Sequence, residues 1–175
     1  MEIGTFQIVA LESEDAKNIH NLMVSNSERF KKYFPKTLSD NLTLESSKAY
    51  ILSKIEETQS KKQYTFGLKD STTKEIAGLI IIKKLNWKTK QGEFAYCLGS
   101  KYTGQGLIIK AIKLVSDFAF NTLNLNTLQI ISHKSNLSSI KVAENNGFIW
   151  QKTLLNEFKP MDELPLDMEL YELKR

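Results

Sequence analysis

The chain has 175 residues, 41% of them hydrophobic, which is enough for one domain with a full core and too few to suggest two. Its 24 lysines and arginines stand against 20 aspartates and glutamates, and the lysines are scattered in pairs among acids, so the charge does not demand nucleic acid as a partner. A single cysteine excludes an internal disulfide, and the longest apolar run, residues 76–82, is far below the roughly 20 residues that span a bilayer.

These limits predict a single domain over residues 1–175 with no membrane anchor. The chain opens without a basic and apolar leader, so we expect a cytoplasmic location. We expect no metal, because the two histidines, His20 and His133, lie far apart and no Cys-x-x-Cys occurs.

Hydrophobic periodicity predicts a strand and two helices in the first third of the chain. Residues 5–11 alternate in the period-2 pattern of a strand, whereas residues 13–24 show helical spacing. Residues 26–36 read as a polar loop that carries several aromatic side chains, and a second helix is expected from about residue 44 to 59. The polar loop therefore separates two helices.

Three antiparallel strands are predicted next, at residues 64–69, 76–87 and 92–98, joined by polar turns. A helix with a long apolar stripe follows from Leu107. The remaining elements are expected to be a strand at 127–132, a helix at 137–146, and two strands at 148–155 and 166–173. This order describes a mixed α/β sheet.

The turn between the third of these strands and its helix carries the first functional signal. Residues 101–107 read KYTGQGL, so Gly104 and Gly106 stand where the helix begins. Glycine lets the backbone turn sharply and lets a ligand approach without meeting a Cβ atom. The first turn of a helix also has unpaired N–H groups and a partial positive charge. The turn could therefore hold an anion, although Gly-x-Gly alone is equally typical of a tight strand-to-helix connection.

A second motif lies about thirty residues further on, where residues 136–148 read NLSSIKVAENNGF. Together the two motifs resemble motifs A and B of the GNAT superfamily of acetyl-CoA-dependent N-acetyltransferases. Residues 92–98, GEFAYCL, and 142–144, VAE, resemble its RimJ/RimL branch, which acetylates ribosomal-protein N-termini and, in many relatives, other amines. The resemblance implies a GNAT fold: a mixed, mostly antiparallel twisted sheet of about seven strands, with helices on both faces and a splay between strands four and five.

The resemblance also implies where acetyl-CoA, the expected cofactor, would bind. Main-chain amides of the glycine turn would hold its pyrophosphate, the edge of the fourth strand would pair with its pantetheine arm, and an asparagine at the start of the last helix would contact it. Lys101 stands where the family usually has glutamine or arginine; lysine keeps the charge of arginine but loses its planar fork. The implied cofactor residues are Cys97, Leu98, Lys101, Tyr102, Thr103, Gly104, Gln105, Gly106, Leu107 and Asn136.

Two residues are candidates for the chemistry. Many family members protonate the departing thiolate with a tyrosine, where this chain has Ala143. Ser139 matches the serine that the RimJ/RimL branch places near the thioester sulfur, and the alternative is a helix serine bonded back to a carbonyl. Glu93 matches an acidic position that serves some members as base, but it could equally be an exposed strand charge. Cys97 is expected to pack as a small apolar residue, with a reactive thiol as the alternative.

The acceptor side of the cleft is expected to carry aromatic residues from the segment between the first two helices. Phe34 is followed by proline, as in the RimJ/RimL branch, and Phe30 and Tyr33 are further candidates, although they could simply cover a helix end. We expect direct attack by an amine in a ternary complex, with a protein N-terminal α-amine as acceptor. A polyamine, amino acid or antibiotic amine, and a catalytically idle CoA-binding module, are the alternatives. Monomer and homodimer both stay open.

Overall fold

The structure is a computed structural model that describes residues 1–159 and 164–175. Its strands form one eight-stranded sheet in the order β1-β2-β3-β4-β5-β6-β8-β7. The β5–β6 pair is parallel and the other neighbouring pairs are antiparallel. The strands are β1 (Glu2–Ile3), β2 (Phe6–Ala10), β3 (Tyr64–Asp70), β4 (Ile76–Asn86), β5 (Gln91–Leu98), β6 (Thr127–Ser132), β7 (Ile149–Phe158) and β8 (Leu166–Lys174).

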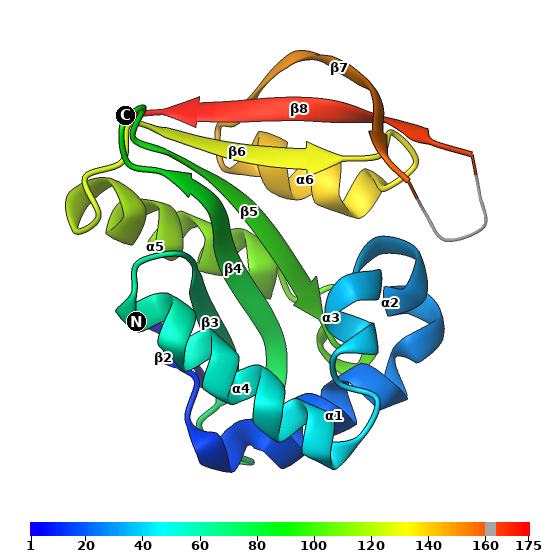
Figure 1. Ribbon diagram of the computed structural model, residues 1–175. Coiled ribbons are helices and arrows are strands. Elements are labelled where there is room, and N and C mark those ends of the chain that lie inside the picture. Colours follow the sequence, from blue (N-terminus) through cyan, green and yellow to red (C-terminus); the bar gives the residue numbers. More distant parts are fainter. Residues whose placement is uncertain (160–163) are drawn as a thin grey trace.

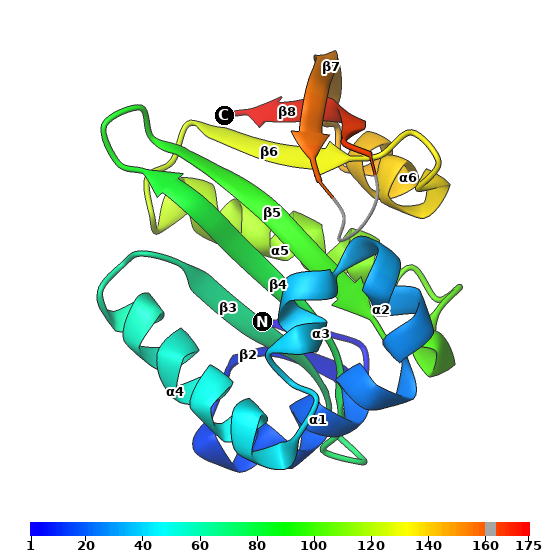
Figure 2. The same ribbon diagram turned by 45° about the vertical axis from the view of Figure 1, so that its right-hand side comes forward.

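Helices cover both faces of this sheet (Figures 1 and 2). They are α1 (Ala16–Ser25), α2 (Ser27–Tyr33), α3 (Pro35–Ser39), α4 (Leu44–Gln59), α5 (Leu107–Asn121) and α6 (Leu137–Asn145), with short 3₁₀ turns at Ser13–Asp15 and Ser100–Tyr102. One apolar cluster packs α1 to α4 on one face, and a larger cluster packs α5 and α6 on the other. No helix in the described residues is long and apolar enough to cross a membrane. The mixed, mostly antiparallel sheet predicted from the sequence is confirmed.

Two details differ from the sequence predictions. The sheet has eight strands rather than about seven, because the two residues of β1 pair with the start of β2. The segment 26–36, expected to be a loop, is largely helical and forms α2 and the start of α3. Pro35 begins α3 as its first residue, where its missing N–H costs no helical hydrogen bond. Helices this short present too few turns for a periodic apolar pattern.

The sheet opens between β5 and β6, which are the fourth and fifth of the strands predicted from the sequence. Their parallel pairing begins at Gln91 and Thr127 and ends at Phe94 and Ile130. Beyond these residues the last half of β5 has no strand partner on this side in the described part of the chain, and β6 leads away toward α6 (Figure 1). The expected splay is therefore present, and it lies beside the start of α5.

Candidate active site

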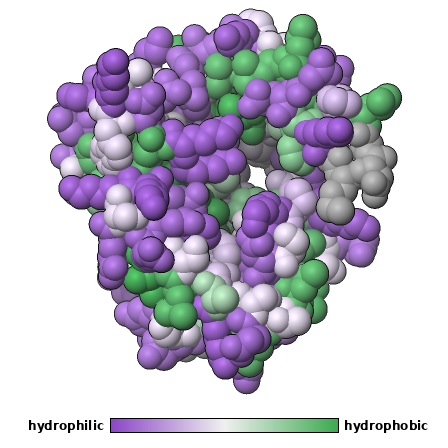
Figure 3. All heavy atoms as spheres, in the orientation of Figure 1, coloured by the Kyte–Doolittle hydropathy of each residue, from purple (hydrophilic) through white to green (hydrophobic). Residues whose placement is uncertain are grey.

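A cleft of about 1730 Å³ runs through the splay and along the face covered by α2 and α3. Figure 3 shows it as a hollow in the surface. Single-ligand pockets are usually about 300–1000 Å³, so this cleft has room for two reactants. Most of the site residues predicted from the sequence line it, and Lys101, Tyr102 and Gln105 do not.

The glycine turn has the backbone of an anion cradle. Gly104 and Gly106 have φ angles of +80° and +68°, a region that residues with a Cβ atom rarely adopt. Gly106 is the N-cap of α5, and no atom lies within 4 Å of where a Cβ would stand on either glycine. Among the described residues no group accepts a hydrogen bond from the N–H of Gly104, Gln105 or Gly106. These donors are available to a ligand at the positive end of a helix.

The residues just before the glycines have structural partners. The N–H of Tyr102 donates to Gly99 O at 3.0 Å, and the N–H of Thr103 donates to Ser100 O at 3.2 Å. Tyr102 is buried, and its hydroxyl donates to Glu75 at 2.8 Å. The amides of Tyr102 and Thr103 are therefore engaged within the turn and are not free donors, contrary to the prediction.

The side chain of Lys101 also points away from the cleft. Its Nζ lies 2.9 Å from Oε2 of Glu75, and both side chains are more than half exposed. The charge of Lys101 is thus engaged in a surface ion pair outside the cleft.

Main-chain groups line the splayed end of β5. Residues along an antiparallel strand turn their main-chain groups alternately toward and away from one neighbour. Gly99 donates to Ala77 beside β4, so by this alternation Cys97 also faces β4, while Tyr96 and Leu98 face the splay. The carbonyl of Leu98 accepts a hydrogen bond from the Arg29 guanidinium at 2.8 Å. The free edge therefore belongs to Tyr96 and Leu98 rather than to the predicted pair Cys97 and Leu98.

Cys97 is buried in the apolar cluster beneath α1 and α4. Burial raises the pKa of its thiol to about 12. A thiol with that pKa is neutral at pH 7 and is a weak nucleophile. The structure supports the packing role of Cys97 over the reactive one.

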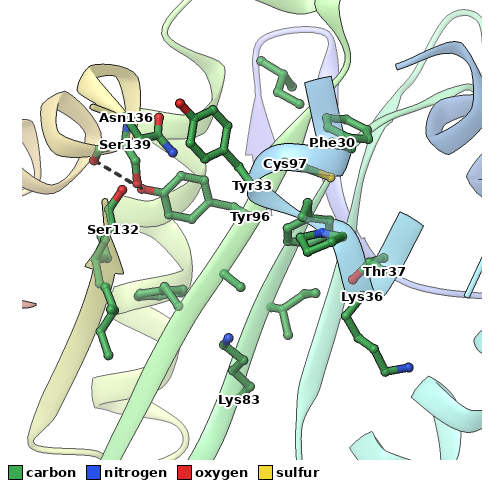
Figure 4. A pocket seen from close by; sticks show the side chains of 18 of the residues that line it. Phe30, Tyr33, Lys36, Thr37, Lys83, Tyr96, Cys97, Ser132, Asn136 and Ser139 are labelled. Carbon is green, nitrogen blue, oxygen red and sulfur yellow. Dashed lines mark hydrogen bonds between the residues drawn. The ribbon is translucent and has the colours of Figure 1, made fainter. Parts of the chain in front are cut away.

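The two α6 residues predicted to face the cofactor stand together at the mouth of the splay (Figure 4). Asn136 is the N-cap of α6, and its side-chain oxygen accepts from the N–H of Ser139 at 3.3 Å. The hydroxyl of Ser139 lies 2.8 Å from the hydroxyl of Tyr96 on β5. Ala143, at the position of the family's tyrosine, is fully buried. A hydroxyl from the strand thus approaches the serine on the helix.

Glu93 faces the other side of the sheet, where the acceptor is expected. The residue is 6% exposed, and its two carboxylate oxygens lie 2.9 Å from Lys83 Nζ and 2.9 Å from Lys84 Nζ. Lys83 is its direct cross-strand neighbour, while a register shift after Lys83 and a positive φ at Lys84 bring the second lysine to the same carboxylate. The hydrogen bond to Glu93 raises the pKa of Lys84, which keeps this lysine charged. Glu93 is therefore a doubly paired ion.

The three predicted aromatic residues form the wall opposite β5. Phe30 is buried and packs edge-on against Phe34, with ring centroids 6.3 Å apart. Tyr33 is more exposed and reaches toward the β6–α6 connection, where Ser135 lowers the pKa of its hydroxyl (Figure 4). Phe30 and Phe34 thus build the wall, and Tyr33 spans the open side of the cleft.

Sequence reasoning missed several residues that line the cleft. Tyr96, Arg29 and the pair Lys83 and Lys84 were seen only as strand or surface positions. The period-2 pattern of β5 carries a usable signal, because it places Tyr96 on the face opposite Cys97 and toward α6. The pairing of Lys84 with Glu93 depends on a local backbone irregularity and has no such signal.

Comparison with known proteins places this geometry in a family. Residues 6–149 match the family described as the acetyltransferase (GNAT) domain. The spermidine N(1)-acetyltransferase of Escherichia coli is 28% identical over 148 residues, which cover 85% of this chain and 75% of that protein.

Solved structures have the same fold. The ribosomal-protein-S5-alanine acetyltransferase of Vibrio fischeri superposes with a TM-score of 0.92 at 22% identity, covering 99% of this chain and 95% of that one. RimL, a ribosomal L7/L12 α-N-protein acetyltransferase solved in complex with coenzyme A, gives a TM-score of 0.90 at 15% identity, covering 98% and 95%. At these identities the likeness shows the fold, and the relatives differ in their acceptors.

Proposed function

The chain belongs to the GNAT family of acetyl-CoA-dependent N-acetyltransferases, and from that premise we propose that its acceptor is a protein N-terminal α-amine. The observation that carries this proposal is the double ion pair of Glu93 with Lys83 and Lys84. A carboxylate held in this way is a poor partner for a polycationic acceptor and a poor base for a strongly basic amine. Both consequences point toward a weakly basic amine.

The residues present fit the cofactor. Acetyl-CoA supplies an activated acetyl group as a thioester. The free N–H groups of Gly104, Gln105 and Gly106 would hold its pyrophosphate, in a place that a Cβ atom would fill. The main-chain groups of Tyr96 and Leu98 would pair with amides of its pantetheine arm, which requires Arg29 to give up the Leu98 carbonyl.

The charges of the cleft argue against a polyamine. Every carboxylate that lines the described part of the cleft lies within 4 Å of a lysine. Besides Glu93, these ion pairs are Asp40–Lys36 at 2.6 Å, Glu57–Lys54 at 2.9 Å and Glu157–Lys84 at 3.7 Å. A polyamine would have to displace a lysine from each carboxylate that it used. A peptide N-terminus brings one cation and uncharged main chain.

The basicity of the amine supports the same choice. An α-amino group with a pKa of about 7.7–8.0 is roughly a tenth neutral at pH 7. A lysine with a pKa near 10.4 reaches the same neutral fraction only if its pKa is lowered by about 2.5 units, about 3.4 kcal/mol. A lysine acceptor would therefore need a free strong base to remove its proton, and Glu93 is engaged by two lysines. An α-amine can attack the thioester directly with little assistance, and water can accept its proton.

The experiment compares acceptors that carry different kinds of amine. Thiol release from acetyl-CoA is followed with a short peptide that has a free N-terminus, with the same peptide N-terminally blocked and carrying one lysine, and with spermidine. We expect release with the first peptide, and mass spectrometry should place the acetyl group on its α-nitrogen. Label on lysine or spermidine alone would contradict the proposal in favour of the alternative acceptors. Binding of acetyl-CoA without release from any amine would indicate an idle binding module.

A further inference from the structure

Two hydroxyl groups from distant parts of the chain meet at the mouth of the splay. Tyr96 Oη on β5 lies 2.8 Å from Ser139 Oγ on α6 and 3.3 Å from the carbonyl oxygen of Ser139 (Figure 4). A serine in a helix can donate its hydroxyl to a carbonyl three or four residues earlier. Among the described residues, Tyr96 is the hydrogen-bond partner of the Ser139 hydroxyl. Ser139 is therefore held by the strand rather than by its own helix.

We propose that Tyr96 is a positioning residue that directs the Ser139 hydroxyl toward the sulfur of the bound cofactor, and so compensates for the tyrosine that α6 lacks at Ala143. This inference deepens the proposed function and rests on it for the placement of the sulfur. It assigns a role to a residue of β5 through its contact with α6.

The distances define two arrangements of the pair. In the first, Ser139 donates to Tyr96 at 2.8 Å, and Tyr96 donates to the Ser139 carbonyl at 3.3 Å, which is long for a hydroxyl donor. In the second, Tyr96 donates to Ser139 Oγ at 2.8 Å, and the hydrogen of Ser139 is free to point elsewhere. A negatively charged acceptor beside Ser139 favours the second arrangement, because a hydrogen bond to a charged group is stronger than the long one that it replaces. The pair can therefore supply a donor when charge appears.

The surroundings keep Tyr96 a donor. Burial raises the pKa of its hydroxyl far above the ordinary value, and the hydrogen bond with Ser139 lowers it by less. A phenol with a raised pKa stays protonated at neutral pH. Its ring also belongs to the cluster packed against α5 and α6, which fixes the position of the hydroxyl.

The chemistry at the sulfur needs a donor and no net proton from Tyr96. Acetyl transfer forms a C–N bond and breaks a C–S bond, and the electron pair of the C–S bond stays on sulfur. The proton that the acylated amine loses restores the thiol through solvent. Ser139 stabilises the charge by donating its hydrogen bond, and Tyr96 stabilises that orientation by donating to Ser139 Oγ. Both residues end the cycle protonated.

The test is the titration of the coenzyme A thiol in its complex with the protein, followed by thiolate absorbance. This measurement needs no amine acceptor, so it stands even if the proposed acceptor is wrong. We expect the bound thiol to titrate about 0.7–1.2 pH units higher in Tyr96→Phe than in the parent, which corresponds to a 5- to 15-fold loss of thiolate stabilisation. Turnover should fall by the same factor, with the KM for acetyl-CoA within about twofold. Tyr64→Phe, which removes a phenol on β3 outside the cleft, is the matched control and should change neither value.

Coupling to Ser139 distinguishes positioning from general support of the fold. Tyr96→Phe should have no effect in a Ser139→Ala background, because the residue it positions is gone. Thiol titration unchanged in Tyr96→Phe, or an equal further loss in the double variant, would overturn the proposal. Tyr96→Met is the second variant if Tyr96→Phe does not fold. Absence of any coenzyme A binding to the parent by calorimetry would overturn both this inference and the proposed function.

Discussion

Replacing Gly106 by alanine should weaken cofactor binding by somewhat more than it weakens the fold. The residue has a φ of +68°, where a Cβ atom costs about 1–2 kcal/mol, and no atom within 4 Å adds a steric penalty in the free protein. The same Cβ would occupy the space in front of the free N–H groups. Losing one hydrogen bond to a charged phosphate costs about 1.5–3 kcal/mol, so the Kd for acetyl-CoA should rise about 10- to 150-fold.

Gly4 provides a control for the backbone strain. It has a φ of +58°, equally open surroundings and a place in the β1–β2 turn outside the cleft, so Gly4→Ala should cost similar stability without changing the Kd. Lys101→Ala removes an exposed ion pair and should change the Kd by less than about threefold. Isothermal titration and thermal melting are measured on all three variants. Equal affinities of Gly106→Ala and Gly4→Ala, or a larger loss in Lys101→Ala, would refute the anion cradle.

Three further outcomes are expected. Ser139→Ala should lower turnover about 10- to 150-fold with cofactor affinity within a few-fold, as measured by steady-state kinetics beside titration; a loss explained by binding alone would leave Ser139 a packing role. The double variant Lys83→Met/Lys84→Met should lose about 3–5 kcal/mol of unfolding free energy, because it leaves the buried carboxylate of Glu93 unpaired, and adding Glu93→Gln should restore most of it in denaturant titrations. Cys97, with its pKa raised to about 12, should resist thiol reagents from pH 7 to 9 until the protein unfolds; rapid labelling of the folded protein would contradict its burial.

Features that depend on local pattern could be predicted from the sequence. The bounds expected for the second helix, residues 44–59, agree with those of α4, and the strands expected at 92–98 and 127–132 became β5 and β6 within one residue. These elements are long or strictly periodic, so burial of one face leaves a clear pattern. The two glycines of the turn were also recognised from the sequence, because residues other than glycine rarely adopt the positive φ that this turn requires.

Features that depend on contacts between distant segments could not be predicted. Tyr96 and Ser139 are 43 residues apart, and the pairing of β5 with β6, the strand that leads to α6, ends at Phe94, before Tyr96. The second lysine on Glu93 depends on the backbone irregularity at Lys84, and Arg29 on α2 donates to the carbonyl of Leu98, which is 69 residues further along the chain. None of these has a sequence period. Each lies at the cleft, where local rules are most often broken.

The gap in the sheet lies between two groups of strands, β1 to β5 and β6 to β8. Within the sheet, four residue pairs, from Gln91–Thr127 to Phe94–Ile130, join the strands β1 to β5 to the strands β6 to β8. The apolar cluster around α5 and α6 and the contact of Tyr96 with Ser139 add to them. A ligand in the gap touches both parts and opposes their separation by RT ln(1 + [L]/Kd), about 2.7 kcal/mol at a hundred times the Kd. Amide exchange in β6 and β8 should therefore slow on cofactor binding even at residues that no ligand contacts. Because the gap lies between the two parts of the sheet, saturation with acetyl-CoA should make these parts unfold more cooperatively.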